Sequence, residues 1–215
     1  MTSYIILLLV IALFSYCLGS LSTTVLASNF VFRRNLKKLG EGNVGLSNFR
    51  RVYGIFGFVK LLLVELVKDA LPLVIGGLIM GAKEHSQAGI AFAGFCMVLG
   101  RLYPAFYGFR GSHATIALIL AGIVVDRTAG ITAILALGAA LWFTRYVSLS
   151  TMISAFFLIA VALLEVDDKT VMLLVVFTGL VVLIKHIPAI KRLRERTELR
   201  LSFEKDISYK FDQKF

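Results

Sequence analysis

The chain has 215 residues, of which 58% are apolar and only 17% are charged. Soluble domains carry roughly 45–50% apolar and about 25% charged residues, so this composition excludes an ordinary cytoplasmic domain and a disordered chain. Lysine and arginine outnumber aspartate and glutamate by 23 to 13, which gives a formal charge of +10. In so apolar a chain this excess indicates contact with anionic lipid rather than with nucleic acid. The sequence therefore predicts one all-α, polytopic integral membrane protein whose partners are membrane lipids.

Seven apolar runs have the length of a transmembrane helix or approach it. In chain order they cover residues 4–27, 54–80, 87–107, 114–125, 128–143, 147–164 and 170–184, and the fourth and fifth are short. A polar segment, 28–53, separates the first two runs. The prediction is a seven-helix membrane domain with motif loops, 1–185, and a basic tail, 186–215. The tail opens with the periodicity of an amphipathic helix that suits an anionic leaflet.

The charges of the connecting segments predict the orientation. With the N-terminus outside, the cytoplasmic segments hold 17 lysines and arginines, whereas the outer turns hold three. Positively charged residues collect on the cytoplasmic side of membrane proteins. We therefore expect seven transmembrane helices with the N-terminus outside and the C-terminus in the cytoplasm.

The second apolar run carries ionisable residues. They are Lys60, Glu65, Lys68 and Asp69, and the last three share one helix face because they lie three or four residues apart. Ionisable groups at bilayer depth are costly and usually face a wet or protein-lined site. One interpretation is a polar pocket near the cytoplasmic side. The other is a helix that begins at the interface and extends its lysines to water.

Three segments carry residue types suited to a phosphorylated ligand. Residues 39–51 read LGEGNVGLSNFRR, with glycines that let backbone N–H groups approach a ligand and arginines that fit a phosphate. The alternative is a loop at the membrane interface that binds no ligand. The segment lacks the P-loop pattern of glycines followed by lysine. The others are GRLYPAFYGFRGSHAT, 100–115, and TRYVSLS, 144–150. The two cysteines lack metal-ligand spacing, and the sequence predicts no metal site and no nucleotide cofactor.

In these segments the chain resembles the PlsY-type acyl-phosphate:glycerol-3-phosphate acyltransferases, small bacterial membrane enzymes with seven helices. Residues 40–51 match the motif GSGNxGxTNxxR in register. The remaining similarities are 18–23 to LGSxPT, 65–72 to DxxKGxxP, 100–115 to GHxFPxFxxFxGGKGVAT, 144–151 to SRYVSLSS and 186–198 to HRxNIxRLxxGxE. The resemblance implies transfer of a fatty acyl group from acyl phosphate to glycerol 3-phosphate, giving lysophosphatidate for phospholipid synthesis. It also implies a multi-pass protein of the bacterial inner membrane.

The resemblance further implies the site residues. Those expected to bind substrate or phosphate are Gly42, Asn43, Gly45, Ser47, Asn48, Arg51, Lys68, Arg110, Gly111, Ser112, His113, Arg145, Ser148 and Glu198. Those expected at the reaction centre, as candidate catalytic residues, are Glu41, Arg101 and His186.

Several motif positions are altered. Glu41 replaces the motif serine and Arg101 the motif histidine, while the loop before Thr115 lacks two residues and the motif lysine. In the tail, Ala189 and Arg196 replace an asparagine and a glycine. Removing one fixed donor typically costs about 2–4 kcal/mol of transition-state stabilisation. The sequence thus leaves open whether catalysis is retained or the chain is an impaired paralogue that binds lipid or regulates an active acyltransferase. A small transporter is less favoured because no inverted repeat is evident.

Overall fold

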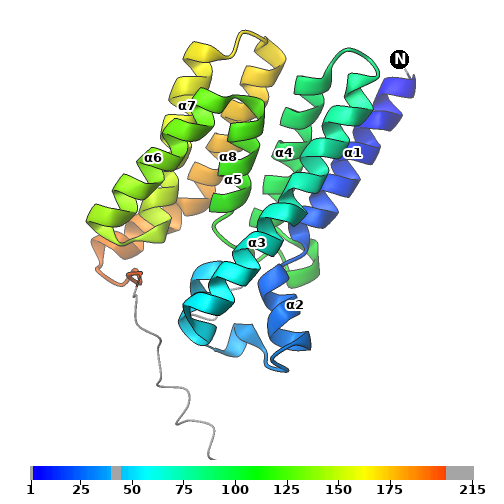
Figure 1. The fold of residues 1–215 in the computed structure, drawn as a ribbon. Coiled ribbons are helices and arrows are strands. Elements are labelled where there is room, and N and C mark those ends of the chain that lie inside the picture. Colours follow the sequence, from blue (N-terminus) through cyan, green and yellow to red (C-terminus); the bar gives the residue numbers. More distant parts are fainter. Residues whose placement is uncertain (1, 40–44, 202–215) are drawn as a thin grey trace, which may run out of the picture.

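The computed structural model describes residues 2–39 and 45–201, and this part of the chain is helical. The helices are α1 (Thr2–Ser20), α2 (Thr23–Phe30), α3 (Leu46–Gly81), α4 (Ser86–Leu102), α5 (Thr115–Val125), α6 (Arg127–Thr144), α7 (Val147–Glu165) and α8 (Lys169–Arg194). Two short 3-10 helices, η1 (Leu36–Lys38) and η2 (Ala105–Tyr107), lie in the connections. Figure 1 shows the long helices side by side, with α2 and the first turns of α3 gathered at the lower end.

The first predicted span is broken in the structure. α1 ends at Ser20, α2 begins at Thr23, and the two helices are bent by 48°. Ser22 lies at the N-cap of α2, where its hydroxyl accepts a hydrogen bond from the Val25 amide at 3.4 Å. A serine at this position favours a new helix start. The span expected over 4–27 is therefore a pair of helices bent after Ser20, which together pass the length and composition test for one span.

A kink divides α3 into a short piece at the lower end and a long straight helix. Gly54 lies at φ 83° and ψ −176°, a backbone region that glycine adopts without a Cβ penalty. The piece before the kink, 46–53, lies beside α2, and the piece after it runs up along α1 and α4 (Figure 1). The predicted second span, 54–80, thus coincides with the straight part of α3. The segment 28–53, expected only to be polar, is partly helical.

The interior of the bundle is organised around α4, which packs against α1, α3, α5 and α8. At the crossing with α1, a Cβ added to Gly100 would lie against the Tyr16 carbonyl and 3.0 Å from the Ser20 amide nitrogen. Small residues allow such close approach between helices in a membrane. The Ser20 hydroxyl also donates to the Gly100 carbonyl at 3.3 Å, so this contact holds α1 just before its bend.

The lengths and composition of the helices fit a membrane. α6, α7, α8 and the segment from α4 through η2 are long and apolar enough to cross a bilayer, and α1 with α2 passes the same test as one bent span. Large apolar side chains on the outer surface are exposed, among them Leu13, Leu78, Trp142, Phe143 and Leu164. In lipid, helices satisfy their own backbone hydrogen bonds. The chain is therefore an all-helical polytopic membrane protein, with four or five candidate spans by these criteria.

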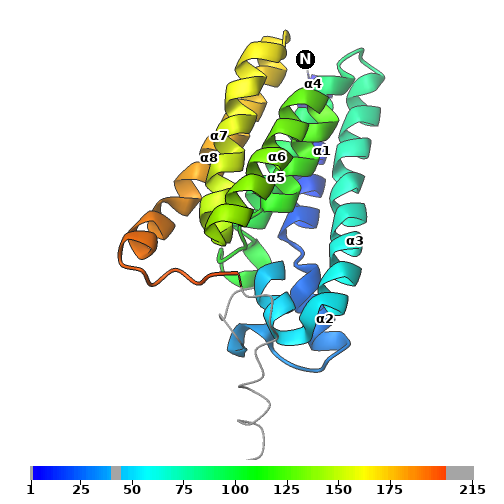
Figure 2. The ribbon, with the colours of Figure 1, turned by 60° about the vertical axis from the view of Figure 1, so that its left-hand side comes forward.

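The last span and the predicted tail helix form one continuous helix. α8 runs unbroken through the expected boundary at residue 185 and ends at Arg194, so the predicted amphipathic helix continues the last span. His186 and Ala189 are buried against the bundle. Residues 195–201, called the strap here, then cross the lower end of the bundle from α8 towards the start of α3 (Figure 2). The strap thus closes the region where the motif segments meet.

Candidate active site

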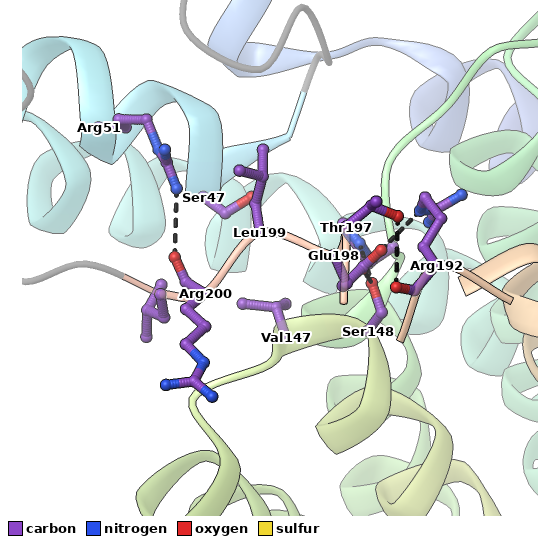
Figure 3. Close-up of a pocket in the computed structure, with 11 residues that line it drawn as sticks. Ser47, Arg51, Val147, Ser148, Arg192, Thr197, Glu198, Leu199 and Arg200 are labelled. Atoms are coloured by element: carbon purple, nitrogen blue, oxygen red, sulfur yellow. Dashed lines mark hydrogen bonds and ion pairs between the residues drawn. The ribbon is translucent and has the colours of Figure 1, made fainter. Parts of the chain in front are cut away.

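Two adjoining cavities open at the lower end of the bundle. The polar cavity, of about 230 Å³, is lined by Ser47, Arg51, His113, Val147, Ser148, Arg192, Thr197, Glu198, Leu199, Arg200 and Leu201 (Figure 3). The apolar cavity, of about 180 Å³, is lined by Thr24, Gly45, Leu46, Ser47, Arg50, Phe58, Glu65, Arg101, Ser112, His113, Ala114, Thr115, Ile116, Ala117, Leu137, Leu141, Val147 and Leu201. Both sets include residues of α3, the loop before α5, the start of α7 and the strap. The polar cavity adds a residue of α8, and the apolar cavity adds residues of α2, α4, α5 and α6. The two cavities share Ser47, His113, Val147 and Leu201.

A hydrogen-bonded chain forms one side of the polar cavity. Ser148, in the first turn of α7, donates to Glu198 of the strap, and the Arg192 Nε atom donates to the other carboxylate oxygen at 2.6 Å. Figure 3 shows these three side chains pointing toward one another. Burial alone raises the pKa of the Glu198 carboxyl, but the hydrogen bonds from Arg192 and Ser148 outweigh it and the pKa is lowered. Glu198 is therefore an ionised carboxylate fixed in place.

Two histidines lie next to this chain. The His113 Nε2 atom is 2.9 Å from the Ser148 hydroxyl, and its ring centre is 5.2 Å from that of His186. Burial, followed by the nearby His186, lowers the pKa of His113 to about 4. His186 points its Nδ1 atom at the Val182 carbonyl, 2.7 Å away. His113 is therefore neutral at neutral pH, and the positive charge of the polar cavity comes from its arginines.

The strap is held against both sides of the site. Arg51 on α3 donates from Nη2 to the Arg200 carbonyl at 3.2 Å, which Figure 3 shows across the cavity. The Leu201 amide donates to the Arg145 carbonyl at 2.6 Å, and Arg200 donates from Nε to the Tyr146 hydroxyl at 3.0 Å. The strap thus ties α3 to the α6–α7 turn over the polar cavity.

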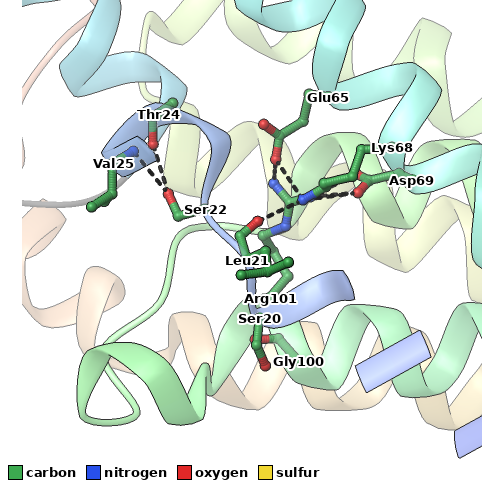
Figure 4. A network of polar contacts seen from close by, with 10 residues as sticks. All are labelled: Ser20, Leu21, Ser22, Thr24, Val25, Glu65, Lys68, Asp69, Gly100 and Arg101. Carbon is green, nitrogen blue, oxygen red and sulfur yellow. Dashed lines mark hydrogen bonds and ion pairs between the residues drawn. The ribbon is translucent and has the colours of Figure 1, made fainter. Parts of the chain in front are cut away.

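A second polar network lies deeper, among charged side chains from α3 and α4 (Figure 4). Arg101 donates from Nη2 to both Asp69 carboxylate oxygens, at 2.6 and 2.8 Å, and its Nη1 atom pairs with Glu65. Lys68 lies 3.3 Å from Asp69 and 3.5 Å from Glu65, and donates to the Leu21 carbonyl at 2.7 Å. We call Glu65, Lys68, Asp69 and Arg101 the buried quartet. Its two cations and two anions balance, so Arg101 adds little net charge to the apolar cavity that it lines.

The structure gathers about half of the predicted site residues that it describes. Those lining one or both cavities are Gly45, Ser47, Arg51, Arg101, Ser112, His113, Ser148 and Glu198. Glu41, Gly42 and Asn43 lie outside the described residues, and their roles stay predictions. The residues that line neither cavity are Lys68, Asn48, Arg110, Gly111, Arg145 and His186, although the His186 ring lies next to that of His113.

Local contacts explain why four of these residues face away. The buried Asn48 amide donates to the carbonyls of Leu36 and Leu39, at 3.4 and 3.0 Å, and so fixes the preceding loop. Gly111 packs against the backbone at the end of α4. Arg110 is exposed, and exposed Arg145 caps α6 with a left-handed backbone, φ 59°. These residues shape the segments around the site and do not reach into it.

Sequence reasoning missed Arg50 and Arg192, which line the apolar and the polar cavity. Arg50 adjoins Arg51 in the same motif, but which of two neighbouring arginines faces a ligand depends on the helix start at Leu46. The sequence predicts Arg192 only as one of the basic residues of the tail helix that lies on lipid. Arg192 and Glu198 lie six residues apart, a spacing that does not predict contact within one helix. They meet only because the helix ends at Arg194 and the chain turns back.

In the part of the chain that the structure describes, no three or more histidine, cysteine, aspartate or glutamate side chains are grouped as metal ligands would be. The donor set of the site instead consists of guanidinium, hydroxyl and imidazole groups. Such groups bind phosphate through charge-assisted hydrogen bonds.

The chain matches a protein family along most of its length. The family model described as glycerol-3-phosphate acyltransferase matches residues 9–196. The glycerol-3-phosphate acyltransferase of Halalkalibacterium halodurans is 29% identical over 200 residues, which cover 89% of this chain and 94% of that protein. That of Pseudomonas savastanoi pv. phaseolicola is 36% identical over 146 residues, covering 67% and 73%.

Solved structures share the fold. The crystal structure of PlsY, an integral membrane glycerol 3-phosphate acyltransferase, in its glycerol 3-phosphate form matches with a TM-score of 0.78 and 22% identity, over 96% of this chain and 99% of that one. The lysophosphatidic acid form matches with a TM-score of 0.75 and 24% identity, over 91% and 96%. From the family match over residues 9–196, the chain belongs to the glycerol-3-phosphate acyltransferase family, as its motifs predicted.

Proposed function

We propose that the protein transfers a fatty acyl group from acyl phosphate to glycerol 3-phosphate and so forms lysophosphatidate. The observation that carries this proposal is the pair of adjoining cavities, one lined by arginines and hydroxyls and the other mostly apolar. A reaction that joins a phosphorylated alcohol to a fatty acyl chain needs both surfaces side by side. Family membership supports the type of reaction.

The polar cavity is the proposed site of the acceptor phosphate. Arg51 and Arg192 are its binding cations because a guanidinium pairs with phosphate oxygens through two parallel hydrogen bonds. Ser47 lies in the first turn of α3, where the helix N-terminus adds partial positive charge. Glu198 would repel phosphate, and its bonds to Ser148 and Arg192 make it a positioning residue.

The apolar cavity is the proposed site of the acyl group near its carbonyl end. Its wall includes Phe58, Ile116, Leu137 and Leu141, and a long chain extends from there into the surrounding lipid. Acyl phosphate already carries a good leaving group, so positioning and charge stabilisation supply much of the rate. Gly42 and Asn43 are proposed to complete the phosphate site from the motif segment, and Glu41 is proposed to lie at the reaction centre.

The experiment is an acyl transfer assay with the purified full chain in detergent, supplied with acyl phosphate and labelled glycerol 3-phosphate. We expect lysophosphatidate to form in proportion to protein. An Arg51→Ala variant serves as the site control because its loss removes a proposed phosphate ligand. No product above that of an empty-vector preparation contradicts the proposal.

The second candidate is a catalytically impaired paralogue that binds lipid or regulates an active acyltransferase. It is favoured by the buried quartet, because the Arg101 charge, at the position of the motif histidine, is taken up by Asp69 and Glu65. Expression in a bacterium that lacks its own acyl-phosphate-dependent acyltransferase discriminates the two. Growth supports the enzyme, whereas binding of lysophosphatidate without growth or turnover supports the paralogue.

The proposed topology has seven crossings, with the N-terminus outside and the C-terminus in the cytoplasm of a bacterial inner membrane. α3 and α5 supplement the five candidate spans: α3 exposes Leu63, Val67 and Leu78, and α5 is a short apolar helix. The site end carries Arg33, Arg34 and the strap arginines, as the positive-inside rule requires. Cysteines introduced at Lys83 and Arg34 test this, because we expect a membrane-impermeant thiol reagent to label only the first in intact cells.

A further inference from the structure

The wall shared by the two cavities marks where the substrates meet. Four residues line both cavities: Ser47, His113, Val147 and Leu201. If the acceptor phosphate lies in the polar cavity and the acyl carbonyl in the apolar one, the attacking hydroxyl and the acyl carbon come together beside these four. Among them His113 is the only one whose side chain is a base, because an imidazole ring nitrogen can accept a proton.

The hydrogen bonds around His113 fix which nitrogen carries its proton. The Glu198 carboxylate accepts only, so the single Ser148 proton points to Glu198. The Ser148 oxygen is then an acceptor for His113, and the Nε2 atom at 2.9 Å must be the donor. In a neutral imidazole the other nitrogen is unprotonated. His113 therefore has a free lone pair on Nδ1.

The same bonds orient the ring and supply a negative charge behind it. Ser148 lies between His113 and Glu198, and Arg192 holds the far oxygen of the carboxylate at 2.6 Å. A base held by a second group, which is itself fixed by a third, is the arrangement found in hydrolase triads. The low pKa of His113, about 4, keeps Nδ1 unprotonated at neutral pH.

We propose that His113 is the general base for the acceptor hydroxyl, oriented through Ser148 by Glu198; this inference rests on the acyl transfer proposed above. The hydroxyl oxygen forms a bond to the acyl carbonyl carbon, and the carbon–oxygen bond to the donor phosphate breaks. The hydroxyl proton moves to His113 Nδ1, and inorganic phosphate leaves with the bond electrons. The imidazolium that forms is stabilised across Ser148 by the Glu198 carboxylate, and then releases its proton to the departing phosphate or to water.

The motif lysine that the sequence lacks near this position offers a discriminating variant. His113→Lys adds a cation for phosphate but provides a protonated amine, which cannot accept the proton. General base catalysis contributes about 100- to 10,000-fold. Because phosphate leaves readily, we expect the low end, so His113→Lys and His113→Gln should each lower kcat about 100-fold. KM for glycerol 3-phosphate should change less than threefold in His113→Lys.

The matched control is His85→Gln, which alters an exposed histidine before α4, away from both cavities. We expect it to leave kcat and KM unchanged. If instead His113 only binds phosphate, His113→Lys keeps kcat while His113→Gln raises KM, and the proposal is overturned. An inactive wild-type protein contradicts the acyl transfer itself, so the two failures are distinguishable.

The pH profile of the wild type tests the same role without a variant. The charged or titratable groups around His113 are His186 and Arg192 on α8, Glu198 and Arg200 on the strap, Arg50, Arg51 and Glu65 on α3, and Arg101 on α4. Burial lowers the pKa of His113 to about 4, and the opposite charge of a bound phosphate raises that pKa again. Since protonated His113 cannot act, kcat should fall as the pH decreases below neutral. His113→Lys should lack this acid limb, and a wild-type kcat that stays independent of pH down to about pH 4 would overturn the proposal.

Discussion

The buried quartet and the polar cavity contain the same kinds of residue and use them in opposite ways. In the quartet, Arg101 and Lys68 lie against Asp69 and Glu65 deep between α3 and α4, and the charges cancel within the group. The polar cavity is lined by Arg51, Arg192 and Arg200 but by one carboxylate, Glu198, which pairs with Arg192. A closed ion network contributes chiefly to folding, whereas an open excess of one sign attracts a ligand of the other sign.

The sharpest way to break the quartet is to remove its central cation. Arg101→Leu leaves two carboxylates that are only 1% exposed with Lys68 alone to balance them. Removing one partner of a buried ion pair costs about 3–5 kcal/mol of folding free energy. Thermal unfolding in detergent should show this as a large fall in Tm. The control, Arg127→Leu, replaces an exposed arginine, and equal Tm values for the two variants would contradict the assignment.

The matching test of the polar cavity removes a cation that faces the open volume. Arg192→Ala deletes a proposed phosphate ligand and the partner of Glu198. Hydrogen bonds to charged groups contribute about 1.5–3 kcal/mol, so KM for glycerol 3-phosphate should rise about 10- to 100-fold with a small change in Tm. Steady-state kinetics measure this. Arg194→Ala, an exposed arginine two residues on that lines neither cavity, should leave KM unchanged.

A variant of Lys68 tests to which region this residue belongs. Its resemblance to the family motif predicts substrate binding, whereas the structure places it in the buried quartet. Lys68→Met removes the donor to the Leu21 carbonyl and one of the two cations near Glu65 and Asp69. Stability should fall by about 1–3 kcal/mol, while KM for glycerol 3-phosphate stays within about twofold. Lys60→Met is the control on the same helix, since Lys60 is exposed. If Lys68→Met raises KM and leaves Tm unchanged, Lys68 binds substrate and the structural role proposed here is contradicted.

The helical membrane fold could be predicted because apolar runs of span length have few alternatives in a bilayer. The break between α1 and α2 after Ser20 was not predicted. A cluster of serine and threonine is also compatible with a continuous helix packed on its neighbours. The continuation of α8 past residue 185 was not predicted either. Basic residues there suggested a helix on the lipid surface, whereas buried His186 and Ala189 hold it in line with the last span.

The sequence predicted which segments form the site, but only in part which side chains line it. The motif segments meet at one end, as their resemblance to the family implied. Their spacing does not reveal that Asn48 turns to the Leu36 and Leu39 carbonyls, or that Arg101 finds Asp69 one helix away. Asp69 stands where the quoted motif has glycine and Arg101 where it has histidine. These two differences from the quoted motifs form one ion pair, which only the packing of α3 on α4 reveals.

The last prediction concerns the acid stability that His113 gives to the region of the polar cavity. Burial lowers the pKa of His113 to about 4 from its usual 6.5, so between these values the unfolded chain binds a proton that the folded chain does not. Stability contributed by the neutral histidine is therefore present above pH 6.5 and is lost as pH falls towards 4. We expect the Tm of the wild type to fall more steeply over this range than that of His113→Gln, measured in one detergent at constant ionic strength. His85→Gln, at an exposed histidine, serves as the control. Parallel curves for the wild type and His113→Gln would contradict the prediction, because they would mean that folding does not change the pKa of His113.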